Sequence, residues 1–213
     1  TGRAKGVLHT HRTMDVGKRT SIDAWRIGGG DVMLMPSRVT HITGYSFGLE
    51  LPFLSEATVA FIDRWDAAQA VPYIDQVHAT AGVAATPFLK ELIDEAERQS
   101  SRLPSMRIFA CGGASVSAEL ILRASQATER MRAIRVYGAT EVPLVTKGFL
   151  GANELGLAAE TDGRVIGYEV KVVDAGNVEV PEGRPGELLI RGPSMMVGYT
   201  DTEETEKAID AGK

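Results

Sequence analysis

Five short apolar segments, each separated from the next by a stretch with helical spacing, restrict the possible folds of this 213-residue chain most strongly. Each segment is short enough to be a strand, and four of the five end at a glycine or a proline. Strands that alternate with helices are typical of βαβ units, whose strands lie parallel in one sheet. The sequence therefore predicts an α/β fold, a mostly parallel sheet with flanking helices, with strands within residues 31–36, 58–63, 81–87, 105–113 and 133–138.

Polar and proline residues mark where the intervening helices begin. Residues 9–27 have helical spacing throughout. Asp66 is well placed to cap a helix over residues 67–78, because a carboxylate at this position accepts from free backbone N–H groups. Pro87 suits the first turn of an amphipathic helix that runs to residue 99. These signals support the alternation of strands and helices.

From Gly163 onward the apolar residues recur with a period of two. Residues 163–174 and 186–199 alternate apolar and polar side chains, and glycine- and proline-rich turns separate them. This pattern predicts antiparallel hairpins, which we interpret as part of a small barrel. We therefore divide the chain into an α/β subdomain over residues 1–155 and a β-rich subdomain over residues 156–213. We interpret both as partial, because the first residues resemble the interior of a motif and the last residues stop in what resembles the end of a helix.

Charge and cysteine content narrow the class of protein. A formal net charge of −5, with both signs mixed along the chain, argues against a nucleic-acid binder, which usually carries a basic face. The single cysteine, Cys111, cannot build a disulfide framework, and we interpret it as a small buried apolar residue. No apolar run approaches the roughly 20 residues of a membrane helix. We expect a cytoplasmic protein, and the sequence does not indicate its oligomeric state.

The opening segment, residues 1–6, combines a threonine, two glycines and a lysine. Glycines let backbone N–H groups approach a phosphate closely, and threonine or lysine side chains add charge-assisted hydrogen bonds. The spacing is not that of a Walker loop. Taken alone, the segment favours a simple turn over a phosphate site.

Two further glycine-containing segments follow predicted strands. Residues 111–114 are Cys-Gly-Gly-Ala, and residues 137–141 are Tyr-Gly-Ala-Thr-Glu. Ligands collect at the carboxyl ends of parallel strands. The second segment offers a ring to stack on a nucleotide, a hydroxyl for a phosphate and a carboxylate for Mg²⁺. Each segment alone is equally typical of an ordinary βα turn or a helix N-terminus.

The remaining polar candidates favour structural roles. His41 lies in a loop after a predicted strand, where a lone histidine is usually exposed or hydrogen-bonded. His9 and His11 are two residues apart, which does not place them on one helical face, so we infer no metal site there. The glutamates between residues 203 and 206 are interpreted as a solvated face. No Ser–His–Asp arrangement in the sequence supports hydrolase chemistry.

The order of the motifs is more specific than any one of them. The chain contains, in this order, TGRAKGV, HITG, GGA, YGATE, GRVIGYEVKVVD and GELLIRGPSMMVGY. This order resembles the adenylate-forming superfamily, which includes acyl-CoA synthetases, firefly luciferase-like enzymes and peptide-synthetase adenylation domains. The resemblance extends over essentially all 213 residues.

The resemblance implies a nucleotide site built from three segments. The residues implied to hold the ATP phosphates are Thr1, Gly2, Lys5 and Gly6. The residues implied to line the adenine site are Gly113, Ala114 and Ser115, with the ring of Tyr137 packing on the base. Gly138 and Ala139 are implied to lie beside the acyl group.

The resemblance also implies which side chains take part in the reaction. Thr140 is implied to contact the α-phosphate and Glu141 to hold Mg²⁺. His41 is implied to shape the pocket for the substrate carboxylate. Together with Lys5, these three residues are the candidates for direct participation in catalysis.

The activity that the resemblance implies is a ligase that uses ATP and Mg²⁺ to join a carboxylic acid to CoA through an acyl-adenylate. The segments YGATEVP, GGASVSAEL and GPSMMVGY resemble those of fatty or alicyclic acyl-CoA synthetases more than those of peptide-synthetase domains, which implies a fatty or alicyclic acid. Two alternatives stay open. One is transfer of the adenylate to a carrier-protein thiol, and the other is a truncated module that binds nucleotide without turnover.

The chain departs from the family pattern at several points. Ala4 replaces the usual proline of the phosphate loop, and Ser115 stands where proline is frequent. The Thr-Gly-Asp motif expected after residues 198–205 does not occur in this chain, and neither does the small C-terminal domain that carries a catalytic lysine. We therefore expect this chain to be inactive by itself.

Overall fold

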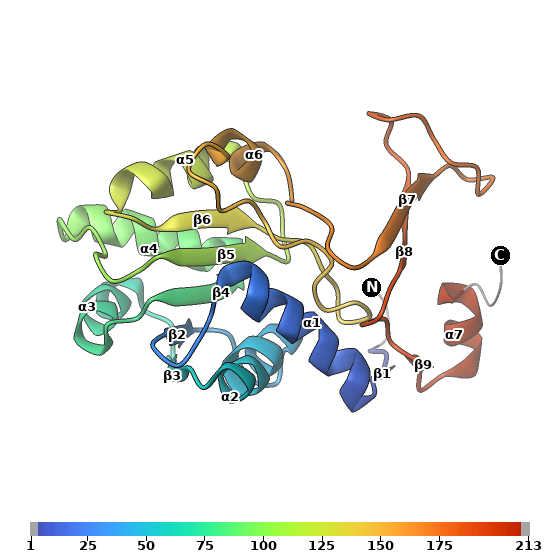
Figure 1. The fold of residues 1–213 in the computed structure, drawn as a ribbon, viewed down its shortest axis with the longest axis horizontal. Coiled ribbons are helices and arrows are strands. Elements are labelled where there is room, and N and C mark those ends of the chain that lie inside the picture. The colour runs from blue at the N-terminus through green and yellow to red at the C-terminus, as the bar shows by residue number, and fades with distance from the viewer. Residues whose placement is uncertain (1–3, 210–213) are drawn as a thin grey trace.

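A computed structural model describes residues 4–209, and a five-stranded sheet forms the centre of its larger part (Figure 1). The strands are Val32–Met35 (β2), Thr58–Phe61 (β3), Ala81–Ala85 (β4), Ile108–Gly112 (β5) and Arg132–Arg135 (β6). Their order in the sheet is β3-β2-β4-β5-β6, and every neighbouring pair is parallel. The α/β fold and its five strands, predicted from the sequence, are thus confirmed.

Helices cover both faces of this sheet. They are His11–Trp25 (α1), Gly44–Glu50 (η1, a π-helical segment), Leu51–Ser55 (α2), Ala67–Val77 (α3), Thr86–Arg98 (α4) and Ala118–Ala127 (α5). The connection from β2 to β3 runs toward one edge of the sheet, and the connections that follow, from β3 through β4 and β5 to β6, run toward the other edge. Because parallel crossovers are right-handed, η1 and α2 lie on one face and α3, α4 and α5 on the opposite face. No helix among the described residues is long and apolar enough to cross a membrane.

Side chains at the helix termini explain where the helices begin. The Asp66 carboxylate accepts a hydrogen bond from Ala68 N–H at 2.9 Å and caps α3. The Ser117 hydroxyl accepts from Leu120 N–H at 3.2 Å and caps α5. Pro87 lies in the first turn of α4, where its missing N–H costs no helical hydrogen bond. The cap predicted at Asp66 and the helix start predicted at Pro87 are confirmed.

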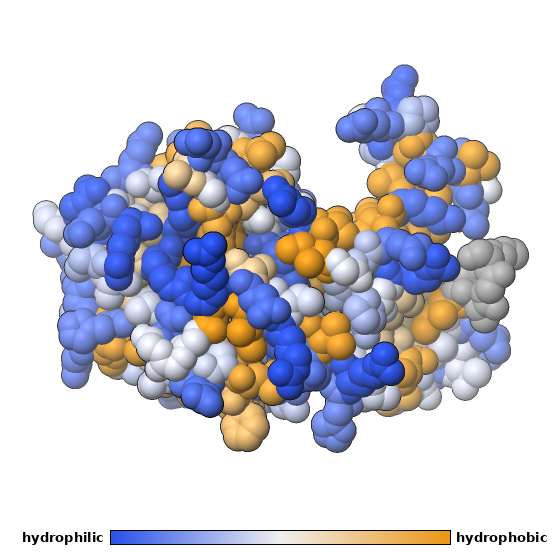
Figure 2. Space-filling model, viewed as in Figure 1, coloured by the Kyte–Doolittle hydropathy of each residue, from blue (hydrophilic) through white to orange (hydrophobic). Residues whose placement is uncertain are grey.

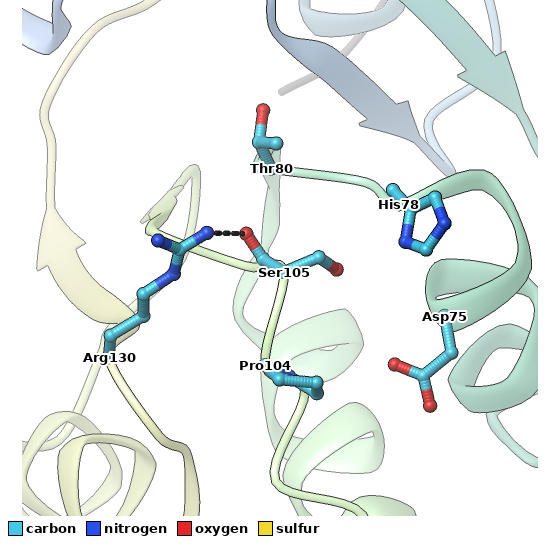
Figure 3. Close-up of a pocket in the computed structure, with 6 residues that line it drawn as sticks. All are labelled: Asp75, His78, Thr80, Pro104, Ser105 and Arg130. Atoms are coloured by element: carbon cyan, nitrogen blue, oxygen red, sulfur yellow. Dashed lines mark hydrogen bonds between the residues drawn. The ribbon is translucent and has the colours of Figure 1, made fainter.

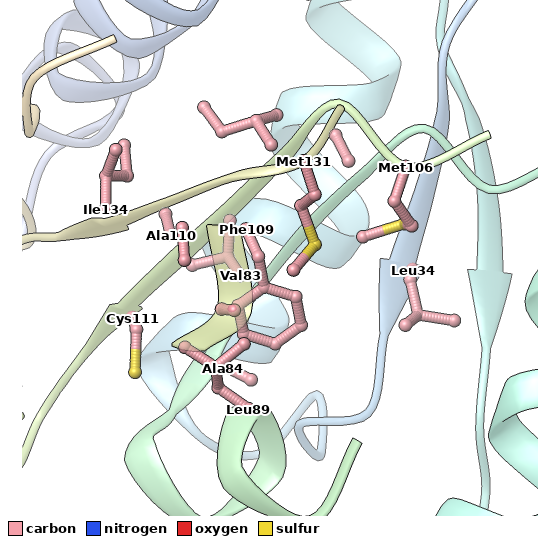
Figure 4. Packing of buried hydrophobic residues seen from close by; sticks show 14 of the residues in the cluster. Leu34, Val83, Ala84, Leu89, Met106, Phe109, Ala110, Cys111, Met131 and Ile134 are labelled. Atoms are coloured by element: carbon pink, nitrogen blue, oxygen red, sulfur yellow. The ribbon is translucent and has the colours of Figure 1, made fainter. Parts of the chain in front are cut away.

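The core lies between the sheet and its helices. Strands β2 and β5 are buried along almost their whole length because both faces of the sheet are covered, which explains their continuous apolar sequence. Figure 4 shows the ring of Phe109 among Val83, Ala84 and Met131. A Cβ atom at Gly82 would lie 3.0 Å from Cδ2 of that ring, so the glycine in β4 gives the aromatic side chain its space.

Asp31 joins the amino ends of three strands to the end of α1. Its carboxylate accepts from Arg107 Nη2 at 2.8 Å, from Arg107 Nε at 2.9 Å and from Thr80 Oγ1 at 2.6 Å. Arg107 also donates through Nη1 to the carbonyl of Trp25 at 2.8 Å. Burial works to raise the pKa of Asp31, but the hydrogen bonds from Arg107 and Thr80 prevail and lower it.

We expect Asp31→Ala to lower the free energy of unfolding by about 2–3 kcal/mol, because Arg107 would stay partly buried without its counter-charge. Urea denaturation of the protein that carries this chain measures the effect. Because folding depresses the pKa of Asp31, its contribution is lost as pH falls, and the difference between the two proteins should shrink below roughly pH 4. Asp15→Ala, which removes only an exposed i,i+4 pair with Arg19, is the control. Equal losses in both variants would contradict this role of Asp31.

The last third of the chain leaves the sheet. Its elements, with the N-terminal strand that joins them, are Val7–Leu8 (β1), Leu155–Glu160 (α6), Glu169–Val173 (β7), Glu187–Arg191 (β8), Gly198–Tyr199 (β9) and Thr202–Ala208 (α7). Strands β7 and β8 form the predicted antiparallel hairpin, which projects from the body across a visible hollow (Figures 1 and 2). Helix α6 packs against α5 and β6, so residues 155–160 lie with the sheet. The subdomain border at residue 155 and the partial barrel remain predictions.

Lys147 is a buried cation between α1 and the segment that follows β6. Lys147 is only 2% exposed to solvent. The ammonium donates to the carbonyl of Leu144 at 3.1 Å and to that of Gly17 at 3.4 Å. Both acceptors are backbone carbonyls, and burial lowers the pKa of Lys147 to about 7.

Candidate active site

The segments singled out in the sequence leave the same edge of the sheet. His41 follows β2, residues 113–115 follow β5 and residues 137–141 follow β6. In a parallel sheet these are all carboxyl ends, where ligand-binding loops of α/β folds gather. A Cβ atom at Gly112 would lie 2.4 Å from the carbonyl oxygen of Val136, so the last residue of β5 packs directly against the residue that follows β6.

Residues 140–141 stand at the tip of a tight turn after β6. Ala139 N–H donates to Val142 O at 2.9 Å, and Val142 N–H donates to Ala139 O at 3.1 Å. A Cβ atom at Gly138 would lie 2.4 Å from the carbonyl oxygen of Pro143, so this position requires glycine. The turn thus fixes the backbone of Thr140 and Glu141 at the carboxyl edge.

The ring of Tyr137 is open to solvent at the start of the same turn. The residue is 38% exposed. Its backbone is held on both sides, because Tyr137 N–H donates to Thr146 Oγ1 at 2.7 Å and Tyr137 O accepts from Val145 N–H at 2.8 Å. A fixed backbone with an accessible ring is suited to stacking on a flat ligand.

Two short strands bring the N-terminal segment to residues 140–141. Strand β1 pairs antiparallel with β9, and Val7 lies opposite Tyr199. Beyond this pair, Thr200 N–H donates to Gly6 O at 2.8 Å. A Cβ atom at Gly6 would lie 2.7 Å from Cγ2 of Thr200. The close pairing places Lys5, next to Gly6, beside the start of α7.

Four polar side chains meet at this pairing, and we call them the Tyr199 cluster: Lys5, Glu141, Tyr199 and Glu204. The Tyr199 hydroxyl donates to Glu141 Oε1 at 2.5 Å. This hydrogen bond, together with burial, raises the pKa of Tyr199 to about 12, so the phenol keeps its proton at neutral pH. On the other side, Lys5 Nζ lies 5.0 Å from the centroid of the Tyr199 ring and 2.5 Å from Glu204 Oε2.

Glu204 corrects an interpretation of the sequence, because it does not belong to a solvated face. Its side chain is 23% exposed and pairs with Lys5 and with Lys207, the second at 3.2 Å. Hydrogen bonds from Lys5 and then from Lys207 lower the pKa of Glu204 below its ordinary value. At neutral pH the contact with Lys5 is therefore an ion pair.

His9 is a second residue whose position the sequence did not reveal. Its Nε2 lies 2.8 Å from the carbonyl oxygen of Thr140, and its Nδ1 lies 3.0 Å from Thr13 Oγ1 in the first turn of α1. The ring thus joins the N-terminal segment to the Thr140 turn. The partners are 131 residues apart in the sequence, so no local pattern announces the contact.

The structure brings together some of the expected site residues and separates others. Lys5, Gly6, Thr140 and Glu141 converge through the Tyr199 cluster and His9. His41 stands at the same edge, but its Nδ1 accepts from Thr43 N–H at 3.2 Å within its own loop. Among residues 4–209, no hydrogen bond or ion pair joins it to the turn after β6. Thr1 and Gly2 lie outside the described residues.

Cys111 lies next to the loop of residues 113–115 but is enclosed in the core, whereas a hollow at the other edge of the sheet lies away from these groups. Cys111 is fully buried in β5, and burial raises the pKa of its thiol to about 11, so it is not a nucleophile. A hollow of about 470 Å³ lies at the amino edge of the sheet, where Arg130 donates to the carbonyl of Ser105 at 3.1 Å (Figure 3). The opposite edge carries all the groups described above.

Comparison with known proteins identifies the chain. Residues 1–200 match the AMP-binding enzyme family. The chain belongs to this family. The AMP-binding chain is 31% identical over 211 residues to the medium-chain fatty-acid–CoA ligase of Escherichia coli K12, covering 98% of this chain and 37% of that ligase. It is 31% identical over 223 residues to 4-coumarate–CoA ligase 2 of Oryza sativa subsp. japonica, covering 99% and 38%. The chain thus spans less than two fifths of these relatives.

Solved structures show the same fold as this AMP-binding chain. A Rhodopseudomonas palustris protein described as a long-chain-fatty-acid CoA ligase has a TM-score of 0.85 at 26% identity, over 99% of this chain and 52% of that one. The ATP-bound MatB protein of the same species has a TM-score of 0.85 at 22% identity, over 99% and 41%. At that lower identity the likeness concerns the fold alone.

Proposed function

We propose that the protein carrying this chain is an acid–thiol ligase, which uses ATP to convert a carboxylic acid to an acyl-adenylate and then to a CoA thioester. One observation carries the proposal: in a chain of the AMP-binding family, Lys5, Thr140 and Glu141 converge at the carboxyl edge of the sheet. The relatives named as CoA ligases support the choice of CoA as the acceptor.

The described residues suit the parts of ATP. The accessible Tyr137 ring offers a stacking surface for adenine, beside the loop of residues 113–115. Gly113 has a φ of +77°, a conformation that glycine adopts without strain, and a Cβ atom there would meet nothing within 4 Å. We assign the phosphates to Lys5, to Gly6 and, in the undescribed segment, to Thr1 and Gly2.

Mg²⁺ fits the donor set at Glu141. Magnesium is commonly bound through one or two carboxylates, with water and substrate phosphate oxygens completing its octahedron. Glu141 supplies a carboxylate whose Oε1 is oriented by Tyr199, and no group of three or more metal-binding side chains exists within residues 4–209. When bound, the ion neutralises negative charge on the phosphates.

The chain's residues then have distinct tasks in the reaction. An oxygen of the substrate carboxylate attacks the α-phosphorus, the bond to pyrophosphate breaks, and acyl-AMP forms. Lys5 holds phosphate charge, and the Thr140 hydroxyl donates to an α-phosphate oxygen. In the second step the CoA sulfur attacks the acyl carbon, AMP leaves, and the thiol proton passes to solvent. His41, Gly138 and Ala139 are assigned to the acid side of the site.

We infer a fatty or alicyclic acid as the substrate, although the relatives carry names of both fatty and aromatic acids. We expect pyrophosphate release by the protein that carries this chain to require a carboxylic acid and to increase several-fold when CoA is added. A panel of fatty, alicyclic and aromatic acids, assayed with and without CoA, measures this. A clear optimum among fatty or alicyclic acids identifies the substrate class.

The same assay separates the two alternatives. Release that is indifferent to CoA points to a carrier-protein thiol as the acceptor. Binding of ATP without release of pyrophosphate for any acid points to a nucleotide-binding module. Either result would overturn the assignment as a CoA ligase.

A further inference from the structure

The Glu204 carboxylate forms an ion pair with Lys5, which is the only described lysine in the segment assigned to the ATP phosphates. Its Oε2 lies 2.5 Å from Lys5 Nζ, and the lowered pKa of Glu204 keeps the carboxylate charged at neutral pH. A phosphate oxygen and a carboxylate oxygen are anions that seek the same ammonium. The structure thus shows Lys5 already bound to an anion of its own chain.

We propose that Glu204 is an internal competitor for Lys5, which the nucleotide phosphate must displace when ATP binds. The proposal rests on the function proposed above and adds a residue that tunes ATP affinity. Glu204 is then a positioning residue, since it acts on the nucleotide through Lys5.

The fold holds Glu204 in a defined place opposite Lys5. Tyr199 N–H donates to Thr205 Oγ1 at 2.8 Å, and Thr205 Oγ1 donates to the carbonyl of Asp201 at 3.0 Å. These bonds tie the first turn of α7 to β9. Strand β9 is in turn paired with β1, directly after Lys5 and Gly6. The contact therefore follows from the strand pairing.

A second cation makes the displacement feasible. Lys207 Nζ lies 3.2 Å from Glu204 Oε1, on the oxygen that does not contact Lys5. When a phosphate takes Lys5, the carboxylate keeps Lys207 as its partner. Lys5 is 38% exposed and so is accessible to a ligand. The exchange thus leaves no buried charge without a partner.

Calorimetric titration of the protein that carries this chain with ATP and Mg²⁺ tests the proposal. We expect Glu204→Gln to tighten ATP binding by about two- to fivefold, the scale of one exposed ion pair. The KM for ATP should fall by the same factor, while the rate at saturating ATP stays unchanged. A structural lesion would instead weaken binding. Glu203→Gln, which removes the same charge from the neighbouring position of α7, should leave ATP affinity unchanged.

A Lys5→Met background shows whether the effect passes through Lys5. There, Glu204→Gln should no longer tighten ATP binding. If Glu204→Gln tightened ATP binding equally in that background, the cause would be repulsion between Glu204 and ATP, or binding of the phosphate by Lys207. That result would overturn the proposal. Equal ATP affinity of the unmodified and Glu204→Gln proteins would also overturn it, while the proposed function would stand. Failure of the unmodified protein to bind ATP would overturn both.

Discussion

Glu141→Gln is expected to lower the rate of adenylate formation by about 10²-fold to 10³-fold, the range seen when one electrostatic contact to a transition state is removed. An amide oxygen is a weaker ligand for Mg²⁺ than a carboxylate, whereas the amide keeps the shape of the side chain. The Tyr199 hydroxyl can donate to the amide oxygen as it now does to Glu141 Oε1. The fold should therefore survive, with a melting temperature close to that of the unmodified protein.

Pyrophosphate release measured at limiting and at high Mg²⁺ concentration tests this role of Glu141. Part of the lost rate should return at high Mg²⁺, because the substitution weakens metal binding rather than removing it. Glu160→Gln, at the exposed end of α6, removes one carboxylate elsewhere and should change neither value. Unchanged release by Glu141→Gln at limiting Mg²⁺ would show that another group holds the metal.

The sheet was predictable from the sequence because burial on both faces leaves a plain signal. Residues 33–35 of β2 and residues 109–111 of β5 are fully buried, and each reads as a continuous apolar run. The cap at Asp66 was predictable because its partner lies two residues away. An element can be predicted from the sequence when the contacts that stabilise it are local or produce a pattern that repeats along a strand.

The Tyr199 cluster could not be predicted because its causes are neither local nor repeated. Strands β1 and β9 have two residues each, too few for a period of two to be recognised. Their pairing alone brings Lys5 to Glu204, so a glutamate that the sequence places on a solvated face becomes the ion-pair partner of Lys5. His9 reaches Thr140 in the same way. The family resemblance named Lys5, Thr140 and Glu141, but not the residues that hold them.

The burial of Lys147 could not be predicted either, because the sequence around a single lysine in an apolar segment does not show whether its side chain is buried. Three features of the fold bury it: α1 crosses it at Gly17, its own carbonyl accepts from Trp25 Nε1 at 2.9 Å, and its ammonium reaches Leu144. The contacts with Gly17 and Trp25 each span more than 120 residues of sequence. The cost of such burial is a property of the folded state that composition cannot reveal.

Lys147→Met is expected to raise the free energy of unfolding by about 2–4 kcal/mol at pH 7. Burial lowers the pKa of Lys147 from 10.5 to about 7, so keeping the lysine in place costs roughly 1.4 kcal/mol for each unit of that shift. Methionine has a similar length and no charge to desolvate. Loss of the hydrogen bonds to Gly17 and Leu144 offsets part of the gain, by about 1 kcal/mol each.

The pH dependence distinguishes this cause from better packing. In the unfolded chain Lys147 keeps its ordinary pKa, so between about pH 7 and pH 10 the unfolded state binds more protons than the folded state. The stability of the unmodified protein must therefore rise with pH across this window, and the advantage of Lys147→Met must shrink. Urea denaturation at several pH values measures both. Lys90→Met, which alters an exposed pair with Asp94, should show no such trend. An advantage of Lys147→Met that is constant from about pH 7 to pH 10 would mean that methionine packs better, and that the buried lysine never loses its proton.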